Sequence, residues 1–319
     1  MEIVRSVVLP RHVWVTGGTG FVGQQLLLAA DRLLPGCEVV AVSRHPEQLP
    51  GGCSTVVPLP LDLAEAGRLE QAFRAAPPGG VIHLAAAADP NWCQEHPEEA
   101  RRLNVDVPRR LADLCREAGS RLVFVSTDLV FDGHAAPYGE TAVPRPPSQY
   151  AAMKLEAERA VAAVLGERAT ICRLPLMYGD PSPSGRDPQG MVWAALAGGP
   201  PARLFIDEFR TPISTVAAAE GLTLALGLAR PVPLLHLGGP ERLSRYELAT
   251  RLAAWLGRPT DRLVPVRQTE VPMAAPRPPD VSLDSRLAGS LGFRPRPLEA
   301  EWERLPGFVA RRAAPASGS

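Results

Sequence analysis

The chain has 319 residues and carries 34 basic and 34 acidic side chains, so its formal net charge at pH 7 is zero. This balance argues against a general affinity for nucleic acid or for anionic membranes. No apolar run is long enough to cross a bilayer, and the start of the chain lacks the layout of a secretory signal. The five cysteines are scattered and lack metal-ligand spacing, which indicates a reduced, cytoplasmic protein without a metal site.

A glycine-rich turn follows the first expected strand, residues 13–15, and precedes an apolar, helix-like run over residues 21–34. This order is the context in which the pyrophosphate of a dinucleotide meets the N-terminus of a helix. A glycine turn can also join two elements without binding a ligand, so the motif alone is weak. The cofactor contacts expected in this turn are Gly17, Thr19, Gly20, Phe21, Val22 and Gly23.

The second expected strand, residues 38–42, ends in Ser43 and Arg44. Dinucleotide-binding folds often place an acidic residue here, where it binds the ribose 2′-hydroxyl. A guanidinium and a hydroxyl suit a 2′-phosphate instead, so we expect NADP(H) as the preferred cofactor, with NAD(H) possible. The alternative for this pair is an ordinary solvated loop.

The third and fourth expected strands, residues 55–59 and 81–84, are each followed by candidate cofactor contacts. Asp62 lies at the carboxyl edge of its strand, where it could reach the adenine amine or only cap the next helix. The run of alanines after the fourth strand would let the chain pass close to a cofactor, although it could also begin a helix. The residues expected to contact the cofactor here are Asp62, Leu63, Ala85 and Ala86.

A helix is expected over residues 97–119, broken or kinked near Pro108, with the polar Asn104 on it. The fifth expected strand, residues 121–125, runs into Thr127. In an open α/β sheet, ligands gather at the carboxyl ends of the strands. We therefore expect the glycine turn, Asp62, the alanines and Thr127 to face one edge of the sheet.

Tyr150 opens a helix expected over residues 151–165, and Lys154 follows it by four residues, which places both side chains on one helix face. Lys154 is the only lysine of the chain, and the other 33 basic residues are arginines. A chain so rich in arginine should keep a lysine only where a compact ammonium is needed. The alternative is a residual surface lysine on an amphipathic helix.

Strands and helices alternate up to about residue 177, which predicts an α/β, Rossmann-type doubly wound parallel sheet over residues 1–177. The pattern then changes, and residues 178–312 are expected to form mainly a smaller substrate-binding subdomain. A late strand at 234–237 could return to the main sheet. Ser244 and Glu247 predict a capping box at the start of a helix, and residues 313–319 are expected to be a disordered tail.

Four segments together resemble the extended branch of the short-chain dehydrogenase/reductase family, and within it the dTDP-4-dehydrorhamnose reductase-like group. They are the phosphate turn, the stretch around Thr127, the helix that carries Tyr150 and Lys154, and a C-terminal piece, residues 15–23, 126–133, 150–158 and 277–284. The chain departs from the family at Ala217, where an acidic residue is common. It also has fewer hydroxyl and acidic residues at 89–93 than is usual.

The resemblance implies reduction of a 4-keto sugar nucleotide, by hydride from NAD(P)H, in carbohydrate biosynthesis of the dTDP-rhamnose type. Tyr150 would be the general acid, Lys154 would lower the pKa of its phenol and hold the nicotinamide ribose, and Thr127 would bind the carbonyl oxygen. Asn104 would orient Lys154 through a water. The residues expected to bind the substrate are Asp128, Arg210 and Arg277.

Two other functions stay open at this level. Relatives of this fold serve as regulatory subunits that bind a nucleotide without turnover, because a fold does not fix a function. A nucleotide-sugar epimerase or dehydratase would keep its cofactor through a full, redox-neutral cycle. The chain could also form a homodimer.

Overall fold

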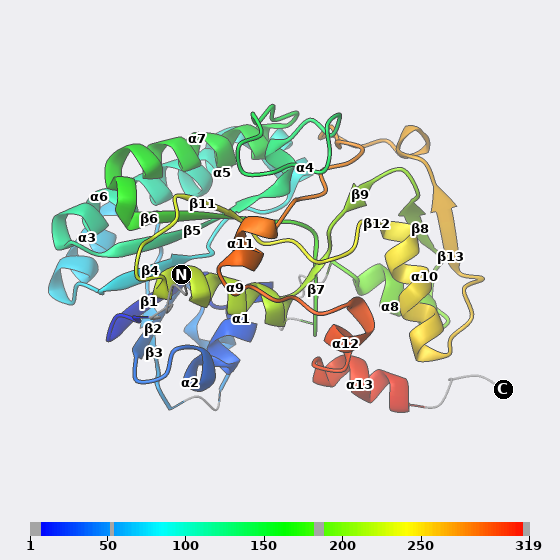
Figure 1. Ribbon diagram of the computed structural model, residues 1–319, viewed down its shortest axis with the longest axis horizontal. Helices are drawn as coiled ribbons and strands as arrows, with labels where there is room; N and C mark the ends of the chain where they lie inside the picture. The colour runs from blue at the N-terminus through cyan, green and yellow to red at the C-terminus, as the bar shows by residue number, and fades with distance from the viewer. Residues whose placement is uncertain (1–7, 52–53, 182–187, 315–319) are drawn as a thin grey trace.

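The computed structural model describes residues 8–51, 54–181 and 188–314, and its centre is a parallel sheet of seven strands (Figure 1). The sheet has the order β11-β6-β5-β4-β1-β2-β3, and each neighbouring pair is parallel. Its strands are β1 (His12–Thr16), β2 (Glu38–Ser43), β3 (Val56–Pro60), β4 (Gly80–His83), β5 (Arg121–Thr127), β6 (Ala169–Leu174) and β11 (Leu234–His236). The predicted doubly wound α/β fold is confirmed.

The strands at the centre of the sheet are buried on both faces, which is why β4 and β6 read as nearly continuous apolar runs. The edge strand β3 differs, because Pro58 and Pro60 have no N–H to donate and are tolerated only where a strand lacks a second neighbour. The opposite edge is β11, which comes from the C-terminal half of the chain and pairs with β6.

Helices cover both faces of the sheet (Figure 1). One face carries a core cluster with Trp14, Phe73 and Phe124, under α3 (Ala66–Ala75), α6 (Val107–Ala118) and α7 (Gln149–Leu165). On the other face, α9 (Thr215–Gly227) packs against α1 (Phe21–Leu28). The sequence did not predict that α9, from the C-terminal half, would cover a face of the central sheet.

Two predicted helices are interrupted. The helix expected over 21–34 breaks at Ala29 into α1 and α2 (Ala30–Leu33). The helix expected over 97–119 consists of α5 (Pro97–Arg101), a π-helical turn (Arg102–Asp106) and α6. Pro108 lies in the first turn of α6, where a missing N–H breaks no helical hydrogen bond. The helix is interrupted near Pro108 as predicted, but the interruption is the π-helical turn before it and not a kink at the proline.

The rest of the chain forms a smaller lobe beside the carboxyl edge of the sheet (Figure 1). Its core contains Tyr178, Trp302 and Phe308. Three two-stranded pairs build it: β7 (Met177–Tyr178) with β10 (Ile213–Ser214), β8 (Ala202–Phe205) with β13 (Leu263–Val266), and β9 (Phe209–Arg210) with β12 (Leu243–Ser244). Its helices are α8 (Gly190–Leu196), α10 (Arg245–Leu256), α12 (Leu298–Trp302) and α13 (Pro306–Ala313).

The capping box predicted at Ser244 and Glu247 is present at the start of α10. Helix α13 includes Ala313, so the predicted disordered tail cannot begin there, and residues 315–319 lie outside the described part. The remaining elements are α4 (Pro90–Glu95), α11 (Arg286–Ser290) and four short 3₁₀ turns, Pro46–Gln48, Asp128–Val130, Gly166–Arg168 and Gln268–Glu270. In the parts of the chain that the structure describes, no helix has both the length and the apolar character to cross a membrane.

Candidate active site

The glycine turn between β1 and α1 is too crowded for side chains at two positions. Gly17 has a φ of +71°, and a Cβ placed on it would lie 2.7 Å from the backbone nitrogen of Ala85. A Cβ on Gly23 would lie 2.2 Å from the carbonyl oxygen of Gly17. No side chain caps the N-terminus of α1 at Gly20, so the first N–H groups of that helix are open to an anionic ligand.

Other predicted cofactor contacts differ in what their side chains can do. Val22 and Leu63 are buried in the two core clusters, so they can meet a cofactor only through their backbone. Phe21 and Thr19 are partly exposed at the start of α1. Ala85 and Ala86, after β4, are also partly exposed and follow the segment that touches Gly17.

At the end of β2, Ser43 is buried and its Oγ accepts a hydrogen bond from the His45 backbone N–H at 3.0 Å. Arg44 is exposed and makes no hydrogen bond or ion pair with any described residue. Asp62 accepts from the Ala64 backbone N–H at 2.9 Å, so its carboxylate closes a turn after β3. The preference for NADP(H) that Ser43 and Arg44 suggested stays a prediction.

Tyr150 and Lys154 lie on α7, whose N-terminus is capped by the hydroxyl of Ser148. Both side chains are buried, with 8% and 3% of their surface exposed. Thr127 ends β5, and its hydroxyl is near enough to the Tyr150 phenol to lower the pKa of that phenol. Thr127 and Tyr150 therefore lie together at the carboxyl edge of the sheet, the edge at which the sequence placed Thr127.

The electrostatics around Tyr150 correct one expectation. Burial, followed by the charges of Cys93 and Asp128, raises the pKa of Tyr150 above its ordinary value, while the nearby Thr127 hydroxyl acts to lower it. Lys154 is not among the causes of this shift. The expected lowering of the pKa of the phenol by Lys154 is therefore absent in this geometry, because desolvation of the buried phenol dominates.

The ammonium of Lys154 lies over the ring of Phe124, 4.1 Å from its centroid. Within the described residues it makes no hydrogen bond or ion pair. Burial lowers the pKa of Lys154 to about 7, although the carboxylate of Glu158 opposes this shift. Such an ammonium is available to the hydroxyls of a ligand.

His83, at the end of β4, was not singled out in the sequence. Its Nδ1 lies 2.7 Å from the hydroxyl oxygen of Thr16, and its buried Nε2 has no partner among the described residues. Burial, helped by the charge of Lys154, lowers the pKa of His83 to about 3, so the imidazole is neutral. The neutral ring adds no positive charge beside Lys154.

Asn104 lies in the π-helical turn and is fully buried. Its amide donates to the carbonyl oxygen of Ala87 at 3.0 Å and accepts from the N–H of Ala87 at 2.9 Å. The side chain thus fixes the alanine segment that follows β4. The expected link from Asn104 to Lys154 through a water stays a prediction.

Asp128 and Arg210, both expected to bind substrate, form a buried ion pair in which Arg210 Nε lies 3.3 Å from Asp128 Oδ2. The other oxygen of Asp128 accepts from the Thr127 hydroxyl at 3.2 Å. Burial raises the pKa of Asp128 to about 6, against the opposing charge of Arg210. The pair joins the turn after β5, residues 127–130, to the smaller lobe. We call this turn the catalytic loop.

Glu208 belongs to the same cluster and was missed in the sequence. It is fully buried, and its Oε1 accepts from Arg210 Nη2 at 2.9 Å and from Arg245 Nε at 3.3 Å. Burial acts to raise the pKa of Glu208, but Arg210, Arg245 and Arg277 together hold it below its ordinary value. One signal was available, because Glu208 and Arg210 are two apart and side chains two apart in an extended chain point the same way.

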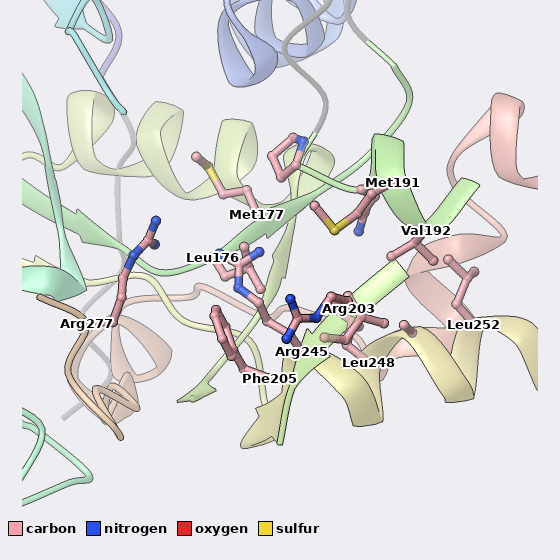
Figure 2. A pocket seen from close by; sticks show the side chains of 14 residues that line it. Leu176, Met177, Met191, Val192, Arg203, Phe205, Arg245, Leu248, Leu252 and Arg277 are labelled. Carbon is pink, nitrogen blue, oxygen red and sulfur yellow. The ribbon is translucent and has the colours of Figure 1, made fainter. Parts of the chain in front are cut away.

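A cavity of about 180 Å³ lies in the smaller lobe next to this cluster (Figure 2). Three guanidinium groups, from β8, α10 and the loop after the last 3₁₀ turn, reach it between mostly apolar walls. Only Arg277 of these was predicted; its Nε is buried without a partner among the described residues. The lining includes Arg203, Arg245, Arg277, Leu176, Met177, Met191, Val192, Phe205, Leu248 and Leu252.

Comparison with known proteins places the chain in a family. The family model described as RmlD substrate binding domain matches residues 11–306. The chain belongs to this family. The match confirms the resemblance that four sequence segments predicted, and it spans both the RmlD-type nucleotide-binding sheet and the smaller lobe.

Individual relatives of this RmlD-family chain carry different names. Methionine adenosyltransferase 2 subunit beta of Xenopus laevis is 32% identical over 245 residues, which cover 74% of this chain and 71% of that protein. The dTDP-4-dehydrorhamnose reductase of Mycobacterium tuberculosis is 30% identical over 220 residues, 67% of this chain and 71% of that protein. The solved structure of UDP-glucose 4-epimerase from Thermus thermophilus, a complex with NAD, is 26% identical with a TM-score of 0.76, and the match covers 95% of this chain and 99% of that one.

Proposed function

We propose that the protein is an NAD(P)H-dependent oxidoreductase that reduces the ketone of a 4-keto nucleotide sugar, as its relative named dTDP-4-dehydrorhamnose reductase suggests. One observation carries the proposal. Thr127 and Tyr150 lie together at the buried carboxyl edge of the sheet, and the ammonium of Lys154 is held on the same helix as Tyr150 without a carboxylate partner among the described residues.

The residues around the glycine turn fit a nicotinamide dinucleotide, because backbone atoms fill the space where side chains at Gly17 and Gly23 would stand and the N–H groups of α1 are open. When bound, that cofactor supplies a hydride. The epimerase from Thermus thermophilus that this chain resembles is described as a complex with NAD. The residues that would hold the cofactor are Gly17, Thr19, Gly20, Phe21, Val22, Gly23, Ser43, Arg44, Asp62, Leu63, Ala85, Ala86, Asn104, Tyr150 and Lys154.

The nucleotide of the substrate fits the cavity of the smaller lobe. Apolar walls suit a base, and Arg203, Arg245 and Arg277 suit the two phosphates. Asp128 and Arg210 lie between that cavity and Tyr150, where Asp128 would accept hydrogen bonds from sugar hydroxyls. We therefore assign cofactor binding to residues 1–177 and substrate binding mainly to residues 178–312.

The chain's own residues move the proton. Because its pKa is raised, Tyr150 stays protonated at neutral pH and can donate to the oxygen on which negative charge develops. Thr127 binds the same oxygen and so stabilises that charge. Lys154 would hold the ribose hydroxyls of the cofactor through its ammonium, which lies on the same helix as Tyr150.

Steady-state oxidation of NADPH with dTDP-4-dehydrorhamnose tests the function directly. We expect turnover that needs the ketone and is lost in Tyr150→Phe, with the half-buried Tyr246→Phe variant as a matched control. Absence of oxidation with dTDP- and UDP-linked 4-keto sugars, by folded protein that binds NADPH, would overturn the proposal.

A second candidate is a regulatory subunit that binds nucleotides without turnover, favoured by the relatives named methionine adenosyltransferase 2 subunit beta. The retained Thr127, Tyr150 and Lys154 favour the reductase. A third is the redox-neutral epimerase. Cofactor that copurifies with the protein and a redox-neutral product would favour it.

Four of the cysteines, Cys37, Cys93, Cys115 and Cys172, are free and buried, which supports a reducing, cytoplasmic setting. The possible homodimer is a separate proposal, which light scattering of the purified protein tests.

A further inference from the structure

A continuous series of polar contacts connects the nucleotide cavity with the catalytic tyrosine. It begins at Arg245, which lines the cavity and donates to Glu208. Arg210 donates to the same Glu208 oxygen, and its Nε lies 3.3 Å from Asp128. Asp128 in turn accepts from the Thr127 hydroxyl at 3.2 Å, and that hydroxyl lies near the phenol of Tyr150.

Glu208 stands in the middle of this series and cannot bind the ligand from where it lies. It has no exposed surface and is not among the residues that line the cavity. Its Oε1 is shared by two guanidinium groups, and its Oε2 has no partner among the described residues. A buried carboxylate is costly unless it is paired. A ligand that binds one of the two arginines therefore leaves the other arginine as the main partner of Glu208.

The groups around Asp128 come from every element packed against it. Arg210 approaches from β9, Glu208 from the residue before β9, Arg245 from α10, and Tyr150 from α7. Thr127 donates from the end of β5. Arg210 is therefore the one cation in ion-pair contact with Asp128 among the described residues, and Glu208 competes with Asp128 for it.

We propose that Glu208 is a positioning residue that couples the phosphate end of the nucleotide cavity to the catalytic loop. The diphosphate of the substrate takes Arg245 from Glu208. Glu208 then holds Arg210 alone, and Asp128 is released from Arg210 to bind the sugar hydroxyls beside Thr127. The effect of Glu208 on turnover rests on the proposed function. Its effect on nucleotide binding, the binding half of the proposal, does not.

The binding half is tested by titration calorimetry with dTDP, UDP and inorganic pyrophosphate, which needs no catalysis. In Glu208→Gln, Arg245 is no longer held by a carboxylate, so we expect dTDP or UDP to bind about 5- to 20-fold more tightly, the size of one charge-assisted hydrogen bond or less. A variant damaged in its fold would bind more weakly instead. Asp207→Asn removes the same charge one residue earlier, where the carboxylate accepts only from the Gln268 N–H within the described part of the chain, and should leave the affinity within about twofold.

Arg210→Gln is the second variant, and it keeps the proposal testable if Glu208→Gln does not fold. It leaves Glu208 paired with Arg245 alone, so nucleotide binding should weaken about fivefold even though Arg210 does not line the cavity. An unchanged affinity in both variants, or equal tightening in Asp207→Asn, would overturn the proposal. So would a failure of wild-type protein to bind any of the three probes.

The effect on catalysis, the catalytic half of the proposal, is measured from the acid limb of the pH profile of kcat. Removing Glu208 leaves Asp128 as the only carboxylate in ion-pair contact with Arg210, so the pKa of Asp128 should fall and the limb should move to lower pH. In Arg210→Gln it should move to higher pH. The value of kcat should fall in both variants, whereas KM should fall in Glu208→Gln and rise in Arg210→Gln. Tighter nucleotide binding in Glu208→Gln without any turnover in the wild type would keep the coupling and reject the reductase. If the wild type turns over and both variants keep its acid limb and its nucleotide affinity, the reductase function stands and the coupling is rejected.

Discussion

The two halves of the active site are built in different ways. The cofactor half depends on short spacings in the sequence, such as that of Gly17 with Gly23 and that of Tyr150 with Lys154 on α7. The substrate half depends on charges that come from distant segments, where Asp128 meets Arg210 and Glu208 meets Arg245. Local geometry can be recognised in a sequence pattern, whereas a charge network is defined only after folding.

The two halves also differ in the energy term that restricts substitution. In the glycine turn it is steric repulsion, because a side chain would collide with the backbone. The charge network is limited by desolvation, because Asp128, Glu208 and Arg210 are all buried and each depends on the others. Substitutions should therefore act through hydride and proton transfer in the first half, and through pH dependence and nucleotide affinity in the second.

The largest expected effect is that of Tyr150→Phe. The variant should fold and bind NADPH, because the phenol occupies a buried position that a phenyl ring fills equally well. Its kcat should fall about 10²- to 10⁴-fold, the usual contribution of a general acid. Steady-state kinetics with fluorescence titration of NADPH would measure both, and a kcat above half the wild-type value would remove Tyr150 from the mechanism.

Lys154→Arg tests whether the single lysine is needed for its shape rather than its charge. We expect kcat/KM to fall about 100-fold or more, because a planar guanidinium has to fit the buried site over Phe124. The control is Arg68→Lys, the reverse exchange at an exposed ion pair, which should be nearly silent. Equal activities in the two variants would contradict the argument from the lone lysine.

These two residues show what a sequence pattern can and cannot provide. The spacing of Tyr150 and Lys154, the glycine turn and the alternation of strands and helices are periodic, so they predicted the sheet and its catalytic edge. The direction of the Tyr150 pKa was predicted wrongly, because burial of the phenol depends on Cys93 and other residues that pack around it in three dimensions. Glu208 was missed for the same reason, since its partner Arg245 is 37 residues away.

Arg44→Ala tests whether the exposed arginine after β2 gives the protein a preference for NADPH over NADH. If Arg44 binds the 2′-phosphate, kcat/KM for NADPH should fall about 10- to 100-fold, the equivalent of one charge-assisted hydrogen bond, while the value for NADH stays almost unchanged. The difference should shrink at high salt, because the guanidinium is exposed. A wild-type kcat/KM for NADH equal to that for NADPH would show that Arg44 is only a solvated loop residue.

The smallest expected effect is the pH dependence that Asp128 causes. Burial raises its pKa to about 6, so the carboxylate becomes protonated at a higher pH than an exposed aspartate would. Only the ionised form accepts hydrogen bonds from both Thr127 and the sugar, so kcat/KM should fall about tenfold per pH unit below this value. Asp128→Asn should be slower and lack this limb, and a wild-type rate that is flat down to about pH 5 would contradict the assignment.

Transfer of deuterium from reduced cofactor to sugar tests the central claim most directly. The protein is incubated with NADPH deuterated at the transferable position of the nicotinamide and with dTDP-4-dehydrorhamnose, and the product is examined by mass spectrometry and NMR. We predict one deuterium at C4 of the sugar for each NADPH oxidised, and none with Tyr150→Phe. A product without deuterium, or nucleotide binding without any product, would contradict the assignment of this site as a reductase.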